Sequence, residues 1–227
     1  MSRSLSLQAV FAGLLAAFVG FASSFAVILQ GLTAVGASQA EAASGLMVLS
    51  LAMGVAGIYL SLKTRMPISM AWSTPGAALL ATTGAIEGGF SVAVGAFLVC
   101  GVLIVFTGFW KPLGRWVAAI PGALANAMLA GVLLGLCLAP VRAVSEFPAY
   151  GLAIVITWVV VVRIRRVLAV PAAVVVTVIL LSMTTDVTLA STGNIWPTPV
   201  FVSPTFSLAG VVGIALPLFI VTMASQN

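Results

Sequence analysis

Long stretches without charge are the feature that most limits what this chain can fold into. No charged residue occurs between Arg3 and Glu41, and none between Glu41 and Lys63. Only 6% of all residues are charged, whereas a soluble domain carries about 25%. So few charges cannot cover a water-facing surface, and about 20 consecutive apolar residues suffice for a helix to cross a bilayer. The sequence therefore predicts an all-α polytopic membrane protein.

Charged and turn-forming residues divide the apolar sequence into eight predicted spans. The sixth and seventh spans are kept apart because the arginines of "RIRR" would each cost about 2.5–3.5 kcal/mol at the centre of a bilayer. The first apolar run is longer than the core of a signal peptide, so it is predicted to remain as a span. The predicted spans are 7–33, 44–62, 68–86, 89–109, 117–139, 149–162, 167–184 and 206–227.

The distribution of charge gives these spans a direction. With a cytoplasmic N-terminus, the cytoplasmic segments hold all of the basic residues except Arg142, as the positive-inside rule requires; these are Arg3, Lys63, Arg65, Lys111, Arg115, Arg163, Arg165 and Arg166. The acidic residues Glu41, Glu87, Glu146 and Asp186 all fall outside. This agreement requires that 68–86 crosses the membrane, although its sequence is unlike that of a lipid-facing helix.

The third span reads "PISMAWSTPGAALLATTGA" and is predicted to be broken. Residues 68–73 can run extended, Ser73 or Thr74 can cap a helix, and Pro75 suits the first helical position, followed by Gly76. A helix that begins inside the membrane directs amide groups and a partial positive charge at a bound anion. Trp72 offers a flat ring on which a planar ligand can stack. A proline-kinked packing helix is the alternative interpretation.

Polar residues in the first and last spans form two further candidate sites. Ser23 and Gln30 share one helical face with Ser24 beside them, while Thr222, Ser225 and Gln226 share another face that ends near Asn227. Hydrogen bonds between helices would explain both groups without any ligand. The residues singled out as substrate-binding candidates are Ser23, Ser24, Gln30, Trp72, Ser73, Thr74, Pro75, Gly76, Thr222, Ser225, Gln226 and Asn227.

Several other functions are disfavoured by the residues that the chain lacks. It has no histidine, and its four acids are scattered, so neither a metal site nor an intramembrane enzyme is predicted, and no cofactor is expected. The basic residues are spread singly, which argues against binding of nucleic acid. No acid lies deep in a span, so no carboxylate is predicted to carry a proton through the membrane. A proton that travels together with a monoanion would nevertheless leave no net charge to be moved.

Three stretches resemble one known family. "PISMAWSTPGAALLA" (67–81), "FASSFAVILQGLTAVGAS" (21–38) and "LPLFIVTMASQN" (216–227) are similar to the benzoate–proton symporters of bacterial inner membranes, which are related in fold to nucleobase and sulfate-type transporters. The resemblance implies two inverted repeats of seven spans, with the third span a short strand plus a half-helix. This chain would then hold the first repeat and the eighth span, as a fragment of a longer transporter.

The resemblance also implies a domain organisation and a substrate. Residues 1–110 would form core-domain spans, 111–184 gate-domain spans, 185–205 an external loop and 206–227 the eighth span. The expected function is import of an aromatic carboxylate such as benzoate with a proton, in a protein that can form homo-oligomers. The acid that nucleobase relatives carry in span eight is absent, because this region reads Ser225–Gln226–Asn227. A nucleobase or inorganic-anion transporter and a non-transporting, truncated membrane protein remain as alternatives.

Overall fold

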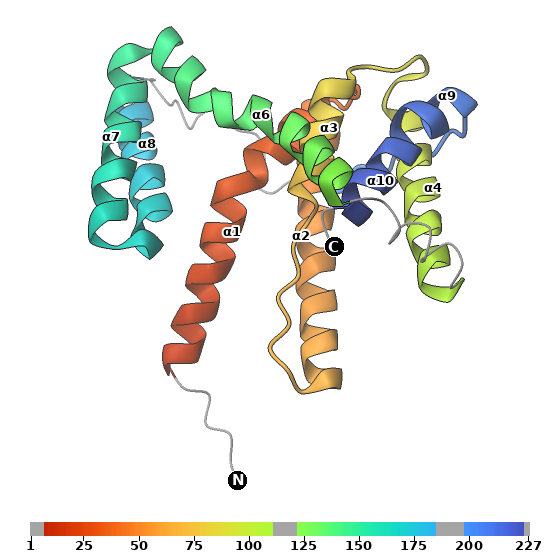
Figure 1. Cartoon of the computed structure of the whole chain (residues 1–227), viewed down its shortest axis with the longest axis horizontal. Helices are drawn as coiled ribbons and strands as arrows, with labels where there is room; N and C mark the ends of the chain where they lie inside the picture. Colours follow the sequence, from red (N-terminus) through yellow and green to blue (C-terminus); the bar gives the residue numbers. More distant parts are fainter. Residues whose placement is uncertain (1–6, 111–121, 185–197, 225–227) are drawn as a thin grey trace. The chain divides into compact units, whose positions relative to one another are not determined.

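The regular structure of this chain is helical throughout its described part. The computed structural model describes residues 7–110, 122–184 and 198–224 (Figure 1). The helices are α1 (Leu7–Ala34), α2 (Gln39–Thr64), α3 (Thr74–Thr83), α4 (Gly89–Phe109), α6 (Gly122–Glu146), α7 (Pro148–Ile164), α8 (Ala169–Thr184), α9 (Leu208–Gly210) and α10 (Leu216–Ala224). A 3₁₀ turn, Arg166–Leu168, precedes α8, and a π-helical turn, Val211–Ala215, joins α9 to α10.

Four stretches of helix in the described residues are long and apolar enough to cross a membrane. They are Ala9–Ala34, Gln39–Thr64, Gly89–Phe109 and Arg166–Met183. Large apolar side chains on them face outward; Val55, Ile58 and Leu62 of α2, for example, are 64–75% exposed. Because such surfaces are stable only against lipid, the chain is a multi-pass membrane protein.

The chain divides into two compact units, one made of residues 1–26 and 137–193 and the other of residues 27–136 and 194–227. In the first unit, α7 and α8 are joined by the short turn at Arg165–Leu168. Arg163, Arg165 and Arg166 are all exposed at this turn. The "RIRR" segment thus separates two helices, while its predicted role of separating two membrane spans stays a prediction.

The second unit is held together by small and branched side chains. Ala93, Ala96 and Cys100 of α4 are buried against Ile214 and Phe219 of the C-terminal helical segment. Gly95 lies between Ala93 and Ala96 on α4, and a Cβ on Gly95 would collide with the carbonyl oxygen of Thr205. Small residues on α4 thus allow the 198–207 segment and α10 to pack closely, as is usual between membrane helices.

The start of α2 differs from the prediction. The helix begins at Gln39, whereas the apolar run predicts a span from residue 44. Ser38 and Glu41 form a capping box: the Ser38 hydroxyl accepts from the Glu41 amide, and a Glu41 carboxylate oxygen lies 2.8 Å from the Ser38 amide nitrogen. The pattern S-x-x-E is visible in the sequence, but hydropathy alone misses it because the first turn is polar.

The predicted end of the fifth span also differs from the end of α6 in the structure. The predicted span stops at residue 139, but α6 continues through Pro140 to Glu146. Pro140 removes one backbone hydrogen bond, yet the backbone hydrogen bonds of the residues before and after it are sufficient to keep the helix continuous. Residues 117–121 of that predicted span lie outside the described residues.

A π-helical turn lies immediately before Pro217. The sequence predicts a kink here because Pro217 cannot donate a backbone hydrogen bond to the preceding turn. The structure places the wider turn Val211–Ala215 at this point, and a regular helix resumes at Leu216. Irregular turns of this kind are a common way to absorb a disrupted ladder of hydrogen bonds.

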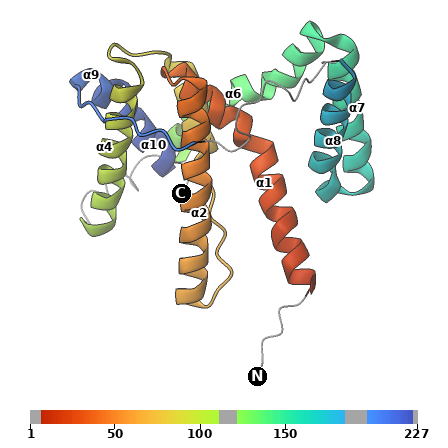
Figure 2. The same ribbon diagram turned by 180° about the vertical axis from the view of Figure 1, so that it is seen from behind.

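The third span is broken between α2 and α3. Residues 67–73 are not helical, and they run back beside α2 before α3 begins at Thr74 (Figures 1 and 2). Ser61 of α2 supports this segment, because its hydroxyl donates to the Ile68 carbonyl at 3.2 Å and accepts from the Ile68 amide at 3.1 Å. No β-strand occurs in the described residues, so a side chain rather than a sheet satisfies this part of the backbone.

Ser61→Ala should destabilise the protein by about 1 kcal/mol, because both backbone groups of Ile68 lose their partner. Thermal unfolding in detergent measures the change. Ser50→Ala is the matched control on the same helix, since the Ser50 hydroxyl donates only within α2, to the Leu46 carbonyl at 2.8 Å. Equal melting temperatures for the two variants would contradict the supporting role of Ser61.

Candidate functional site

The first turn of α3 is the centre of the candidate site. Ser73 is its N-cap, with an extended backbone conformation (φ −78°, ψ 94°). Its hydroxyl accepts from the Gly76 amide at 3.1 Å, and its carbonyl accepts from the Ala77 amide at 3.0 Å. The predicted start of this helix is confirmed, although Pro75 occupies the second helical position rather than the first. With ten residues, α3 is about 15 Å long, half the thickness of the hydrocarbon core.

This helix end offers fewer donors than its sequence suggests. Pro75 has no amide hydrogen, and the Gly76 amide is already bonded to the Ser73 hydroxyl. The Thr74 amide makes no hydrogen bond within the described part of the chain, but Thr74 does not line the cavity beside this helix end. A bound anion would therefore need help from side chains.

Thr222 of α10 lies against the same cap. Its hydroxyl oxygen is 3.4 Å from the Ser73 hydroxyl oxygen. Ser73 then accepts from both Gly76 and Thr222, which leaves its own hydroxyl hydrogen to donate elsewhere. The structure thus brings together a residue of the third predicted span and a residue of the eighth.

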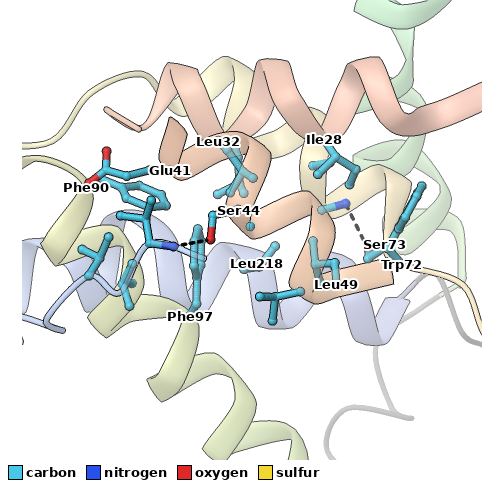
Figure 3. Close-up of a pocket in the computed structure, with 18 of the residues that line it drawn as sticks. Ile28, Leu32, Glu41, Ser44, Leu49, Trp72, Ser73, Phe90, Phe97 and Leu218 are labelled. Atoms are coloured by element: carbon cyan, nitrogen blue, oxygen red, sulfur yellow. Dashed lines mark hydrogen bonds between the residues drawn. The ribbon is translucent and has the colours of Figure 1, made fainter. Parts of the chain in front are cut away.

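A cavity of about 500 Å³ opens beside the capped helix end (Figure 3). Its size is within the range of small-molecule sites. In Figure 3, Trp72 and Ser73 lie at one end, while Glu41 and Phe90 lie at the other. The walls come from α1, α2, α3, α4, α10 and the 200–202 segment, and the lining residues are Ile28, Leu32, Glu41, Ser44, Gly45, Val48, Leu49, Trp72, Ser73, Gly76, Ala77, Leu80, Phe90, Val94, Phe97, Val200, Phe201, Val202 and Leu218.

The walls of this cavity are mostly apolar. Ser44 is buried, and its hydroxyl accepts from the Val200 amide at 2.9 Å, which ties the 200–202 segment to α2. Glu41 is the charged residue among the lining residues, and its carboxylate is engaged by the Ser38 amide and hydroxyl, each at 2.8 Å. No lysine or arginine is among the described residues that line the cavity. The described lining therefore offers no basic side chain to attract an anionic ligand.

The other predicted site residues are distributed more widely. Thr74 and Pro75 lie in the first turn of α3 but do not line the cavity. Gln30 is exposed on α1, and Ser24, which belongs to the other unit, donates its hydroxyl to the Gly20 carbonyl at 2.9 Å. Ser23 lies in α1, and nothing further is described of its side chain; Ser225, Gln226 and Asn227 lie outside the described residues.

Several lining residues were not singled out from the sequence. Phe90, Val94 and Phe97 line the cavity from one face of α4. Their i, i+4, i+7 spacing is a visible signal of a shared helical face, but it is equally typical of a lipid-facing stripe. Leu218 and Ser44 carry no such signal, because only the packing of α2, α3 and α10 brings them to the cavity.

Comparison with known proteins agrees with this architecture. The family described as "Benzoate membrane transport protein" matches residues 3–227. The chain belongs to this family. The predicted resemblance is thereby confirmed, and a membrane transport protein is expected to move a solute without chemical conversion.

Two curated proteins are similar to the chain. "Inner membrane protein YdcO" of Escherichia coli (strain K12) is 38% identical over 218 residues, which is 95% of this chain and 55% of that protein. "Benzoate membrane transport protein" of Acinetobacter baylyi is 25% identical over 237 residues, covering 100% of this chain and 57% of that protein. The chain thus spans about half the length of these relatives. No solved structure gives a significant match.

Proposed function

We propose that the chain forms part of a secondary transporter that imports an aromatic carboxylate, such as benzoate, with a proton across the bacterial inner membrane. The single observation that carries this proposal is the cavity at the Ser73-capped start of α3. It joins polar donors at one end to an apolar space large enough for a ring. Family membership supports the substrate class, and the similar protein from Escherichia coli is named an inner membrane protein.

The substrate carboxylate would lie near Ser73. The Ser73 hydroxyl would supply a hydrogen bond there, and the Trp72 ring lines the same end of the cavity, where it would stack on the substrate ring. One helix end contributes about 0.3–1 kcal/mol to binding of a negative group, and up to about 2 kcal/mol when partly buried. Desolvation of a carboxylate costs several kcal/mol, so these donors are too weak to hold the anion alone.

A proton that accompanies the substrate removes this deficit. Neutral benzoic acid has little charge to desolvate, and its carbonyl oxygen can accept a hydrogen bond from the Ser73 hydroxyl. Proton coupling through the substrate also requires no carboxylate within a span, in keeping with the positions of Glu41 and Glu87 near helix ends. Thr222, whose hydroxyl contacts that of Ser73, is proposed to position α10 at this site. The candidates Ser23, Ser24, Gln30, Ser225, Gln226 and Asn227 stay predictions from the sequence.

The proposed architecture follows the predicted one. Residues 1–110 would supply core spans and 111–184 gate spans of a fold with two inverted repeats, with 185–205 outside, 206–227 as the eighth span and the N-terminus in the cytoplasm. Among other cargoes, an inorganic anion is disfavoured by the absence of lysine and arginine from the described lining of the cavity. A nucleobase transporter is the remaining alternative, since its ring would also fit an apolar space.

Uptake of radiolabelled benzoate into membrane vesicles that contain the protein tests the proposal. A gradient of one pH unit, acid outside, should support about tenfold accumulation if one proton moves with each benzoate. A protonophore should abolish the effect. Vesicles without the protein control for benzoic acid that crosses the lipid unaided. Uptake no greater than in those control vesicles would refute transport, and uptake insensitive to the gradient would refute proton coupling.

A further inference from the structure

The wall of the cavity formed by α4 carries two aromatic rings. Phe90 and Phe97 both line the cavity, with their ring centroids 6.5 Å apart and their planes at 71°. This is an edge-to-face pair, the arrangement that aromatic rings prefer. Each ring is partly buried and packs on both hydrophobic clusters of the second unit, so neither is free to swing away from the cavity.

Leu218 lies between Phe97 and the capped helix end in the cavity (Figure 3). A Cβ on Gly76 would lie 2.8 Å from a Leu218 methyl carbon, so Leu218 directly contacts the first turn of α3. Leu218 and Phe97 pack on the same hydrophobic cluster, and Figure 3 shows Leu218 between Phe97 and Ser73. A ligand whose polar group reaches Ser73 therefore extends past Leu218 toward the ring of Phe97.

We propose that Phe97, backed by Phe90, forms the subsite that selects an aromatic ring over a saturated ring of similar size. This inference rests on the proposed function and adds to it a residue that discriminates between substrates. An apolar wall of leucines would accept either kind of ring by burial alone. The ring of Phe97 adds an attraction that requires a π-system in the ligand, and the edge-to-face pair with Phe90 holds that ring in place.

The expected preference is modest. Aromatic pairs contribute about 0.5–1.5 kcal/mol beyond burial, which corresponds to roughly a two- to tenfold difference in affinity. Benzoate and cyclohexanecarboxylate are the appropriate probes, because both present a carboxylate on a six-membered ring and only benzoate has π-electrons. The dissociation constants of the purified full chain in detergent give the ratio directly.

Phe97→Leu keeps an apolar side chain but removes the ring. It should weaken benzoate binding by about fivefold and change cyclohexanecarboxylate binding by less than twofold. Phe106→Leu is the matched control on α4, since Phe106 is 55% exposed and does not line the cavity; it should change neither constant. Phe97→Tyr keeps the ring and should retain the preference for benzoate.

The outcomes separate this inference from the proposed function. A wild-type chain that binds neither probe refutes both. A wild-type chain that binds benzoate, combined with Phe97→Leu that leaves the benzoate to cyclohexanecarboxylate ratio unchanged, refutes the ring subsite alone. If Phe97→Leu does not fold, Phe90→Leu serves instead, because loss of the backing ring should lower the same ratio about twofold; an unchanged ratio there would also overturn the proposal.

Discussion

Gly76→Val should weaken benzoate binding by at least about 100-fold, the largest effect expected of any single substitution at this site. Gly76 is buried in the first turn of α3 and lines the cavity. A Cβ there would lie 2.8 Å from a Leu218 methyl carbon and 3.0 Å from the Ser73 hydroxyl oxygen. The branched side chain must therefore displace Leu218, the cap, or both, and it fills the space beside the polar groups that would hold the carboxylate.

Gly101→Val is the control for Gly76→Val. Gly101 is also helical and belongs to the same unit, but a Cβ on it would meet nothing within 4 Å. Its benzoate dissociation constant, measured by scintillation proximity on the purified protein, should match that of the wild type. Gly76→Ala should have an intermediate effect. Wild-type affinity in Gly76→Val, with the protein folded, would contradict a site at the capped helix end.

The break in the third span could be predicted because its cause is local. Ser73, Thr74 and Pro75 carry the chemistry of a helix start in their own side chains and rings, and the structure begins α3 at that point. The charge pattern likewise required a turn at Arg163–Arg166, where the structure has one. Where the residues that determine a helix start or a turn lie within that start or turn, the sequence alone is sufficient to predict it.

The walls of the cavity could not be predicted, because their cause is tertiary. Phe97 and Leu218 look like ordinary apolar residues of their helices, and only the packing of α10 against α3 and α4 brings them to a shared space. The extended segment shows the same limit, since its backbone partner is Ser61 and not a neighbouring strand. The start of α2 was mispredicted for a different reason. The capping box of Ser38 and Glu41 is local and visible in the sequence, but the prediction placed the start by hydropathy instead.

Gly31→Ala should destabilise the protein by about 2 kcal/mol, although alanine is the better helix former. A Cβ on Gly31 would lie 2.5 Å from the Ala77 carbonyl oxygen and 3.3 Å from the Leu80 Cβ. The first of these is a backbone atom, so it cannot move aside without moving α3. Ala77 also donates its amide to the Ser73 carbonyl, and a shift of α3 therefore distorts the cap itself. Benzoate affinity should fall together with stability.

The apparent melting temperature in detergent measures this effect, and about 2 kcal/mol should lower it by roughly 5 °C for a protein of this size. Gly13→Ala is the matched control on α1, because a Cβ on Gly13 would meet nothing within 4 Å. Its melting temperature should stay equal to the wild type or rise slightly, since only helix propensity changes. If Gly31→Ala melts no lower than Gly13→Ala, then α1 does not hold α3 in place, and the position of the Ser73 cap must depend on α10 through Thr222 and Leu218 instead.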